Sequence, residues 1–277
     1  MKKFLTIAAV AFAAFATVSC DKENGTENGG ENNTPETRKI LSALPSEIDE
    51  EGNLVSGRTF RYNEDGSLAG IDEVWTNDDG SLGTYNLNVV KTGNKLELID
   101  DDQYVAMSWT VNAKGYVTTY VYNENSTYTF EYDADDHLTK IYEIYQGGEP
   151  ELKSVMTWEN GNLTSWTLEK YNEDGTPRVK AQTYTEELNV GGIHTIYNDK
   201  LAGEQLLKRW MLEAGFFGKP SKNLVNTDGW QDSDRYAKYE YRTDDDDYVI
   251  AEVKWYLNSD LTTWKKDNET YLIWVSK

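Results

Sequence analysis

One hairpin-forming element recurs along the chain and restricts it to a sheet of successive antiparallel strands. An aromatic residue is followed by a turn rich in Asn, Asp and Gly and then by Leu, as in residues 62–68 (YNEDGSL), 132–138 (YDADDHL) and 158–163 (WENGNL). Asn-Gly and Asp-Gly supply the positive φ angles that tight hairpins need. Units that repeat at a fixed spacing bury their apolar faces by stacking on one another, which predicts one continuous sheet.

The spacing of these aromatic residues indicates the size of the repeating unit. The residues that we expect to end a strand recur about 23 to 26 positions apart, at Tyr62, Tyr85, Trp109, Tyr132, Trp158 and Tyr184. Each interval fits two strands and one turn. We predict a mainly β domain over residues 38–277, a curved antiparallel meander or barrel-like sheet of roughly 12 to 15 strands. Apolar residues on both faces of many strands favour curling of such a sheet.

Residues 199–218 break the strand pattern and predict a single helix near 200–215. Its apolar side would consist of Leu206, Leu207, Trp210, Met211 and Ala214, with Lys208, Arg209 and Glu213 on the remainder. Gly215 is a natural stop for this helix. We expect the Trp210 side to pack into the concave face of the sheet; a surface helix over one strand pair is the alternative.

The N-terminus is typical of an exported precursor. Lys2 and Lys3 precede the uncharged, apolar residues 4–18, which are shorter than the ~20 residues of a permanent membrane span, so residues 1–19 are predicted to be a signal peptide. Residues 17–20 (TVSC) resemble the bacterial lipobox, with Thr17 where Leu is usual. Cys20, the single cysteine of the chain, is therefore predicted to be acylated and to anchor the mature protein to a membrane.

The segment after Cys20 predicts an acidic, disordered tether over residues 21–37, because none of its residues could join a core. Residues 20–23 (CDKE) resemble the lysine-plus-acid patterns of surface-exposed lipoproteins in Bacteroidetes-type bacteria. We expect an outer-membrane lipoprotein of the cell envelope; its outer face is favoured over the periplasm. The formal net charge of −21 disfavours nucleic acid as a partner.

A second resemblance covers most of the chain. Residues 215–224 (GFFGKPSKNL), together with the lipobox, the acidic tether and the repeated hairpins, resemble an uncharacterised Bacteroidetes-type lipoprotein family of unknown function with a porin-like fold. The resemblance implies a curved antiparallel sheet or a barrel-like domain over residues 38–277. It implies no activity, because none is established for the family.

The porin-like description does not by itself predict a pore. A membrane barrel needs a lipid-facing apolar band on every strand. Acidic and basic residues such as Asp72, Glu73 and Lys254 interrupt the predicted strands. A lipid anchor would also be redundant for an integral barrel, so we expect a domain outside the bilayer, with a transmembrane barrel as the alternative.

Catalytic motifs are scarce, and no cofactor and no metal-ligand spacing are predicted. Of the two histidines, His137 lies in a predicted exposed turn and His194 lies beside a Gly-Gly pair. Acidic runs occur at residues 100–102, 133–136 and 244–247. Solvated turns explain these runs best, and weak calcium binding by residues 244–247 or a carboxylate-based hydrolase are the alternatives.

Aromatic residues offer the clearest candidates for binding. Indole rings stack on sugars, and the candidate binding residues are Trp166, Trp230, Trp255 and Trp264. Cross-strand packing is the structural alternative for each of them. We expect a non-enzymatic module that binds a glycan, peptide or lipid in the concavity of the sheet. A structural component that pairs with a protein partner through a sheet edge is the second hypothesis, and the hydrolase is the third.

Overall fold

The computed structural model describes residues 39–52, 54–171, 175–188, 207, 209–231, 236–257 and 262–276. All of these lie in one compact unit, residues 37–277. Their structure consists of seventeen strands and one short helix, α1 (Arg209–Glu213). The strands are β1 (Lys39–Ile48), β2 (Leu54–Tyr62), β3 (Leu68–Thr76), β4 (Leu82–Thr92), β5 (Lys95–Asp100), β6 (Val105–Val111), β7 (Val117–Val121), β8 (Ser126–Tyr132), β9 (Leu138–Tyr145), β10 (Glu151–Glu159), β11 (Asn162–Tyr171), β12 (Pro177–Leu188), β13 (Asn223–Trp230), β14 (Tyr236–Thr243), β15 (Val249–Leu257), β16 (Trp264–Tyr271) and β17 (Ile273–Ser276).

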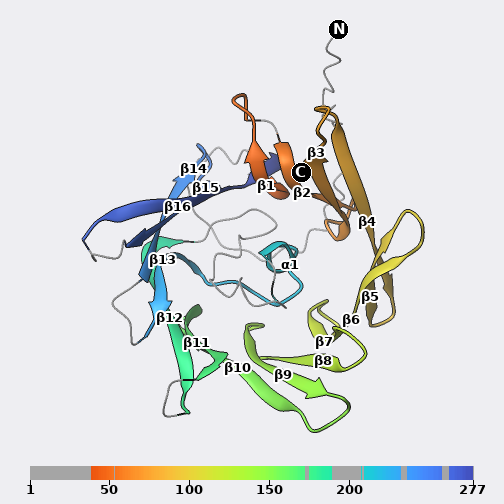
Figure 1. Cartoon of the computed structure of the whole chain (residues 1–277), viewed down its shortest axis with the longest axis vertical. Coiled ribbons are helices and arrows are strands. Elements are labelled where there is room, and N and C mark those ends of the chain that lie inside the picture. Colours follow the sequence, from red (N-terminus) through yellow and green to blue (C-terminus); the bar gives the residue numbers. More distant parts are fainter. Residues whose placement is uncertain are drawn as a thin grey trace, which may run out of the picture. The chain divides into compact units, whose positions relative to one another are not determined.

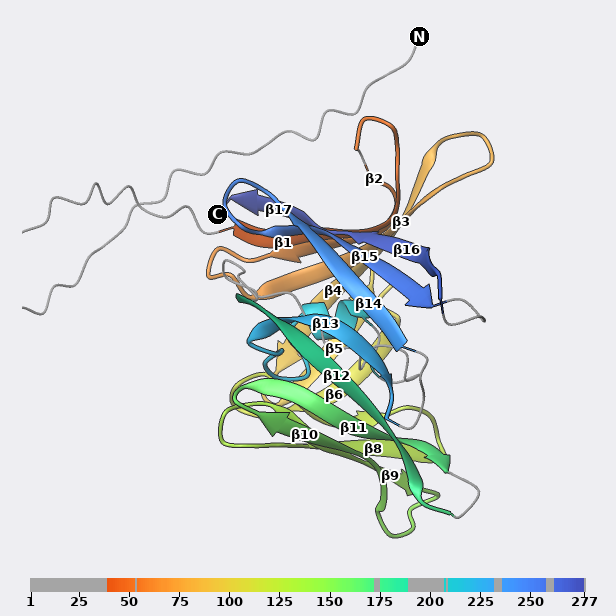
Figure 2. The ribbon, with the colours of Figure 1, turned by 90° about the vertical axis from the view of Figure 1, so that its left-hand side faces the viewer.

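Strand pairing follows the chain and then returns to its start. Each strand from β1 to β15 pairs antiparallel with the next one (Figure 1), and β17 pairs antiparallel with β1. A closed ring of antiparallel strands requires an even number of them. Here β16 and β17 run in the same direction and are separated only by Leu272, so together they act as one bent strand in a ring of sixteen. Figure 2 shows this ring from the side, with β17 next to β1.

The predicted mainly β, barrel-like architecture is confirmed, but the predicted number of strands was too low. Strands of five to seven residues, such as β5, β7 and β8, are joined by short turns and fit more strands into each interval than we expected. Three of the aromatic residues expected at strand ends, Tyr85, Trp109 and Tyr184, instead lie within β4, β6 and β12.

The predicted turn chemistry is confirmed. In residues 63–67 the Asn63 amide donates to the Ser67 carbonyl over 2.8 Å, and Gly66 takes φ of 88°. The turn at residues 133–137 has the same hydrogen bonds, and Asp136 takes the left-handed position with φ of 75°. Aspartate tolerates this conformation better than most residues, so a turn without Gly keeps the same geometry.

Six aromatic side chains tie neighbouring strands together at one rim of the ring. Each donates a hydrogen bond of 2.6–2.9 Å to a buried backbone carbonyl on the neighbouring strand: Tyr62 to Leu41, Tyr132 to Val117, Trp158 to Leu138, Tyr184 to Leu163, Tyr241 to Val225 and Trp274 to Val249. All six acceptors lie beside a register shift in the strand ladder. A buried carbonyl that accepts no hydrogen bond costs free energy. Avoiding that cost explains why large aromatic donors recur at these positions.

The register identifies one face of every strand as the inner face. Phe60 is opposite Ile71, Trp109 is opposite Tyr120, and the same side continues around the ring through Met156 and Trp166. The side chains on this face are mostly buried and form one apolar core. The other face carries ion pairs such as Arg61 with Asp72 and is the outer face.

The core is completed by a plug, which we define as α1 together with residues 214–222. Trp210, Met211 and Leu212 are buried in the same core as the inner faces of the strands, and α1 lies inside the ring in Figure 1. Phe216 packs on Trp109 with ring centroids 5.2 Å apart, and Phe217 packs on Phe130 at 5.1 Å. The expectation that the Trp210 side packs into the concave face is confirmed.

The predicted length and polarity of the helix need correction. Helix α1 has five residues, whereas residues 200–206 and 208 of the expected helix lie outside the described residues. Glu213, expected on the polar side, is 3% exposed. Its burial follows from the closed ring, which surrounds the helix on all sides. Gly215 ends this element with φ of 77°, as predicted.

The ring has two rims. The plug rim contains the turns 63–67, 112–116, 133–137 and 160–161, and the plug is bonded to it: the Val117 amide donates to the Phe216 carbonyl at 2.8 Å, and the Lys222 amide donates to Gly161 at 2.9 Å. The opposite rim contains the turns 77–81, 101–104, 122–125 and 146–150. Lys39 starts β1 at the plug rim, where its ammonium bonds Asp244 at 2.7 Å.

Candidate functional site

A buried charge cluster fixes the plug to the wall of the ring. Arg209 donates from Nε to Glu213 on its own helix at 2.9 Å and from Nη1 to Glu252 on β15 at 3.1 Å. The side chains of Glu213 and Glu252 are 0% and 6% exposed. Burial alone would lower the pKa of Arg209, but the charges and hydrogen bonds of Glu252 and Glu213 raise it above its usual value. The guanidinium therefore stays charged and holds both carboxylates.

Two tyrosines adjoin this cluster and stay neutral. Burial raises the pKa of the Tyr62 hydroxyl well above its usual value, and the charge of Glu213 raises it further. Burial also raises the pKa of Tyr239, which donates to Asp228 at 2.6 Å. These hydroxyls act as hydrogen-bond donors within the ring. The arrangement is suited to structural support, because the two carboxylates are bound to one guanidinium.

The inner face changes character toward the opposite rim. Near the plug rim its side chains are buried, whereas several aromatic side chains near the opposite rim remain well exposed: Trp75 at 41%, Tyr85 at 36%, Tyr145 at 57% and Tyr256 at 41%. The register places all of them on the same face as the core. These four residues, which we call the rim aromatics, are thus directed inward and reach solvent. They are the candidate binding residues: Trp75 and Tyr85 lie on the neighbouring strands β3 and β4, whereas Tyr145 and Tyr256 lie elsewhere on the ring, on β9 and β15.

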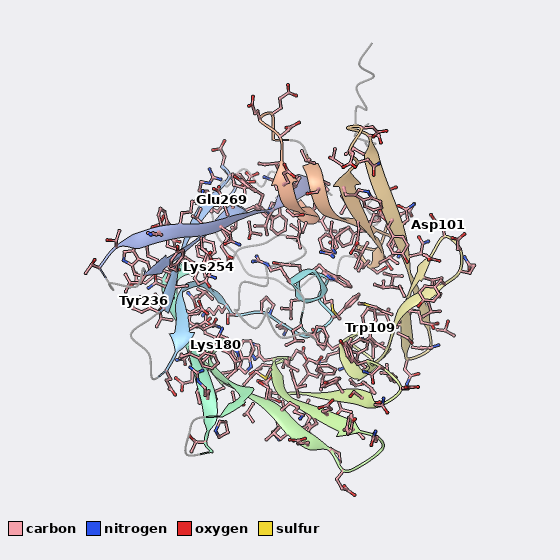
Figure 3. All side chains as sticks on the ribbon, viewed as in Figure 1. Asp101, Trp109, Lys180, Tyr236, Lys254 and Glu269 are labelled. Atoms are coloured by element: carbon pink, nitrogen blue, oxygen red, sulfur yellow. The ribbon has the colours of Figure 1, made fainter. Side chains whose placement is uncertain are left out.

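The structure divides the four selected tryptophans into two pairs. Trp166 and Trp230 lie on the inner face, on either side of Lys180, whose ammonium is 5.8 and 5.5 Å from their ring centroids. Trp166 is 1% exposed, and the guanidinium of Arg178 covers the Trp230 ring at 3.8 Å. Figure 3 labels Lys180 on this wall and Trp109 on the opposite side of the ring. Both rings already have partners.

Trp255 and Trp264 lie on the outer face. Lys238 lies between them, 5.3 and 5.1 Å from the two ring centroids, and Tyr236 packs edge-on against Trp264 at 5.3 Å. By strand alternation Lys238 is on the face opposite Tyr239, which belongs to the interior. The two tryptophan pairs therefore lie on opposite faces of the sheet and cannot form one site.

Three more residues singled out in the sequence are Cys20, His137 and His194. Cys20 and His194 lie outside the described residues. The prediction that His137 is exposed was wrong: it is 8% exposed and stacks on Trp158 with ring centroids 4.2 Å apart. Its backbone bridges to Gly218 of the plug, which explains the burial of this turn.

The acidic runs lie at turns, and the first carboxylate of each run accepts hydrogen bonds from the protein itself. Burial would raise the pKa of Asp244, but hydrogen bonds from Lys39 and from the Tyr248 and Asp246 amides lower it below its usual value. Within the described parts of the chain, no group of three or more His, Cys, Asp or Glu side chains is placed to hold a metal ion. The helical segments of those same parts include none that is long and apolar enough to cross a membrane.

Sequence reasoning missed Trp75, the most exposed tryptophan of the inner face. Its position becomes evident only from its register with Gly83 on the neighbouring strand. A Cβ atom built on Gly83 would come within 2.3–2.6 Å of three ring atoms of Trp75, so the indole lies across this glycine. The available signal was the Gly within a β-rich stretch, which often marks a close approach by another group.

Comparison with one solved structure supports the same fold. A porin-like protein from Bacteroides uniformis is 18% identical, with a TM-score of 0.61 over 87% of this chain and 98% of the other. A second porin-like protein, from Bacteroides vulgatus, is 12% identical over 85% of this chain and 98% of the other, with a TM-score of 0.49. No curated protein matches the chain.

A family match covers residues 47–251, from the end of β1 into β15, and therefore includes the plug and three of the four rim aromatics. The matched region is most of the sheet described above. The chain belongs to the family described as a domain of unknown function (DUF4595) with porin-like fold.

Proposed function

We propose that this protein is a lipid-anchored binding protein of the bacterial cell envelope, which holds its ligand on the inner face at the opposite rim and does not catalyse a reaction. The observation that carries the proposal is the exposure of the rim aromatics, between 36% and 57%, on the face whose side chains are buried near the plug rim. Exposed aromatic side chains on a concave surface are common in ligand sites. Their exposure leaves them available for contact.

The outer face supports a position outside the bilayer. Arg61 pairs with Asp72 at 2.8 Å and Lys140 pairs with Glu131 at 3.1 Å on that face. Charged side chains in a lipid-facing band would be costly. We propose that acyl chains on Cys20 hold the protein at an outer membrane instead, favouring its external face. Lys39 lies at the plug rim, so a tether from Cys20 joins the domain at that end, away from the rim aromatics.

The remaining hypotheses have less support. The sheet closes through β1 and β17, which removes most of the strand edges that a protein partner could extend. The buried carboxylates Glu213 and Glu252 both bind Arg209, an arrangement unlike the separated acid and base of a glycoside hydrolase. Binding without catalysis therefore accounts for more of the observed geometry.

The test is a binding screen on the mature chain with Cys20 replaced by Ser. Oligosaccharides, peptides and fatty acids are added separately while the melting temperature is recorded. A ligand at about 100 times its Kd stabilises the folded state by about 2.7 kcal/mol. For a domain of this size that corresponds to a rise of roughly 5–10 °C. The proposal fails if no compound of the three classes shifts the melting temperature.

A further inference from the structure

Trp75 forms a preset aromatic surface at the opposite rim. Its indole lies across Gly83. Only glycine leaves room for the ring at this position, because a Cβ atom there would come within 2.6 Å of Cε2, Nε1 and Cζ2 of Trp75. Nε1 donates to Asn77 Oδ1 at 3.0 Å, which fixes the ring orientation and satisfies its polar atom. The ring is backed by the strand and is 41% exposed. What it offers to solvent is therefore an apolar ring surface.

Polar groups suited to sugar hydroxyls lie beside this surface on the same face. Tyr85, two residues after Gly83, is 36% exposed and donates to Asp100 Oδ2 at 3.1 Å. Glu73 is in register with Tyr85 and accepts a hydrogen bond from Arg58 Nη2 at 2.6 Å. Two carboxylates and one guanidinium thus surround two exposed aromatic rings, with a net negative local charge.

From this arrangement we infer that Trp75 and Tyr85 form a stacking platform for neutral carbohydrate chains. A pyranose ring has an apolar C–H face that packs on an aromatic ring, and hydroxyls around its edge that need hydrogen-bond acceptors. Glu73 and Asp100 supply acceptors close to the rings. Their excess negative charge disfavours sugars that carry carboxylates. The inference rests on the proposed function and specifies its ligand class.

A purely structural role for Trp75 is the competing explanation. An aromatic side chain over a strand glycine can stabilise the strand pair without any ligand. The two roles differ in what Gly83→Val does. A branched side chain at position 83 occupies the space of the indole and displaces it, yet Val favours strands and keeps Trp75 in the chain. A stacking platform then loses affinity while the fold is retained.

The experiment titrates the mature chain, with Cys20 replaced by Ser, with cellohexaose, maltohexaose, mannohexaose and xylohexaose, and with hexagalacturonate as the acidic counterpart. Isothermal titration calorimetry gives affinity, and tryptophan fluorescence reports contact with an indole. We expect at least one neutral hexasaccharide to bind and hexagalacturonate not to bind. Trp75→Ala and Gly83→Val should each weaken binding at least tenfold, and Trp75→Phe should keep most of the affinity.

Trp264→Ala is the matched control, because it removes a tryptophan from the outer face near the same rim. It should bind as the unmodified protein does, and melting temperatures confirm that every variant is folded. If the affinity for neutral hexasaccharides is unchanged by Trp75→Ala and Gly83→Val, the platform is overturned but the proposed function stands. Binding of only hexagalacturonate, a peptide or a fatty acid overturns the ligand class. An absence of binding by every compound overturns the platform and the proposed function together.

Discussion

Replacing Arg209 by Met should destabilise the domain more than almost any other single polar substitution. Arg209 lies between the carboxylates of Glu213 and Glu252, whose side chains are 0% and 6% exposed. Met preserves much of the side-chain volume but removes the positive charge. Breaking a buried ion pair by removing one partner typically costs about 3–5 kcal/mol, because buried charge is left uncompensated. At about 2–4 °C per kcal/mol for a domain of this size, the melting temperature should fall by roughly 6–20 °C.

The pH dependence of this loss has a definite sign. Burial favours the neutral form of a carboxyl group, so without the guanidinium the folded state gains by taking up protons. A group that binds protons more tightly in the folded state contributes stability at low pH and loses it as the pH rises. The difference in melting temperature between Arg209→Met and the unmodified protein should therefore narrow from pH 8 to pH 5. Differential scanning calorimetry at both pH values measures it.

Two further variants test the cause of the effect. Combining Arg209→Met with Glu213→Gln and Glu252→Gln removes all three charges and should recover most of the lost stability, since no buried charge remains. Lys140→Met, which breaks an ion pair of the exposed outer face, should leave the melting temperature unchanged. An Arg209→Met protein that melts within about 2 °C of the unmodified one at pH 8 would refute the reasoning.

Three other predictions address the hairpin ties, the plug and the anchor. Tyr132→Phe removes the hydrogen bond to the buried Val117 carbonyl and should cost about 1–2 kcal/mol in urea unfolding, whereas Tyr122→Phe, at a ring that is 45% exposed, should cost nothing measurable. Equal effects of the two would contradict a specific role for the tie. Phe217→Ala should cost about 3–5 kcal/mol by the same method, because its ring is 0% exposed within the core; a loss below about 1 kcal/mol would show that the plug is not packed as described. Cys20→Ser should move the protein from the membrane fraction to the soluble fraction, and a variant that still sediments with membranes would disprove the anchor.

The parts of the fold that depend on local chemistry could be predicted from the sequence. The turns at residues 63–67 and 133–137 have a geometry set by Asn, Asp and Gly within five residues, so the hairpins and the mainly β class followed. The position of Glu213 depends instead on closure of the ring through β1 and β17, which are more than 200 residues apart. Helical periodicity distinguishes polar from apolar sides, but it cannot reveal that the surroundings enclose both.

The candidate site was predicted less well, because the face of a strand residue depends on register. Bulges interrupt simple alternation, as between Thr157 and Trp158 or between Lys254 and Trp255, and each such shift changes which side chains point inward. For that reason Trp166 and Trp255 were grouped as candidates although they lie on opposite faces. Trp75 was missed for a related reason, since its exposure is a consequence of pairing with Gly83.

The size of the ring connects the plug with the rim aromatics. An antiparallel ring of sixteen strands is wide; in porins of this strand number the interior is a water-filled channel. Side chains on the strands alone do not fill such a space, and here α1 with residues 214–222 supplies the missing apolar volume at the plug rim. The strands extend beyond this filling, so the inner face of their far ends keeps Trp75 and Tyr85 exposed. Among the described residues, the plug packs at one end of the ring, and the exposed aromatic side chains of the inner face lie at the other end, where we propose that the ligand binds.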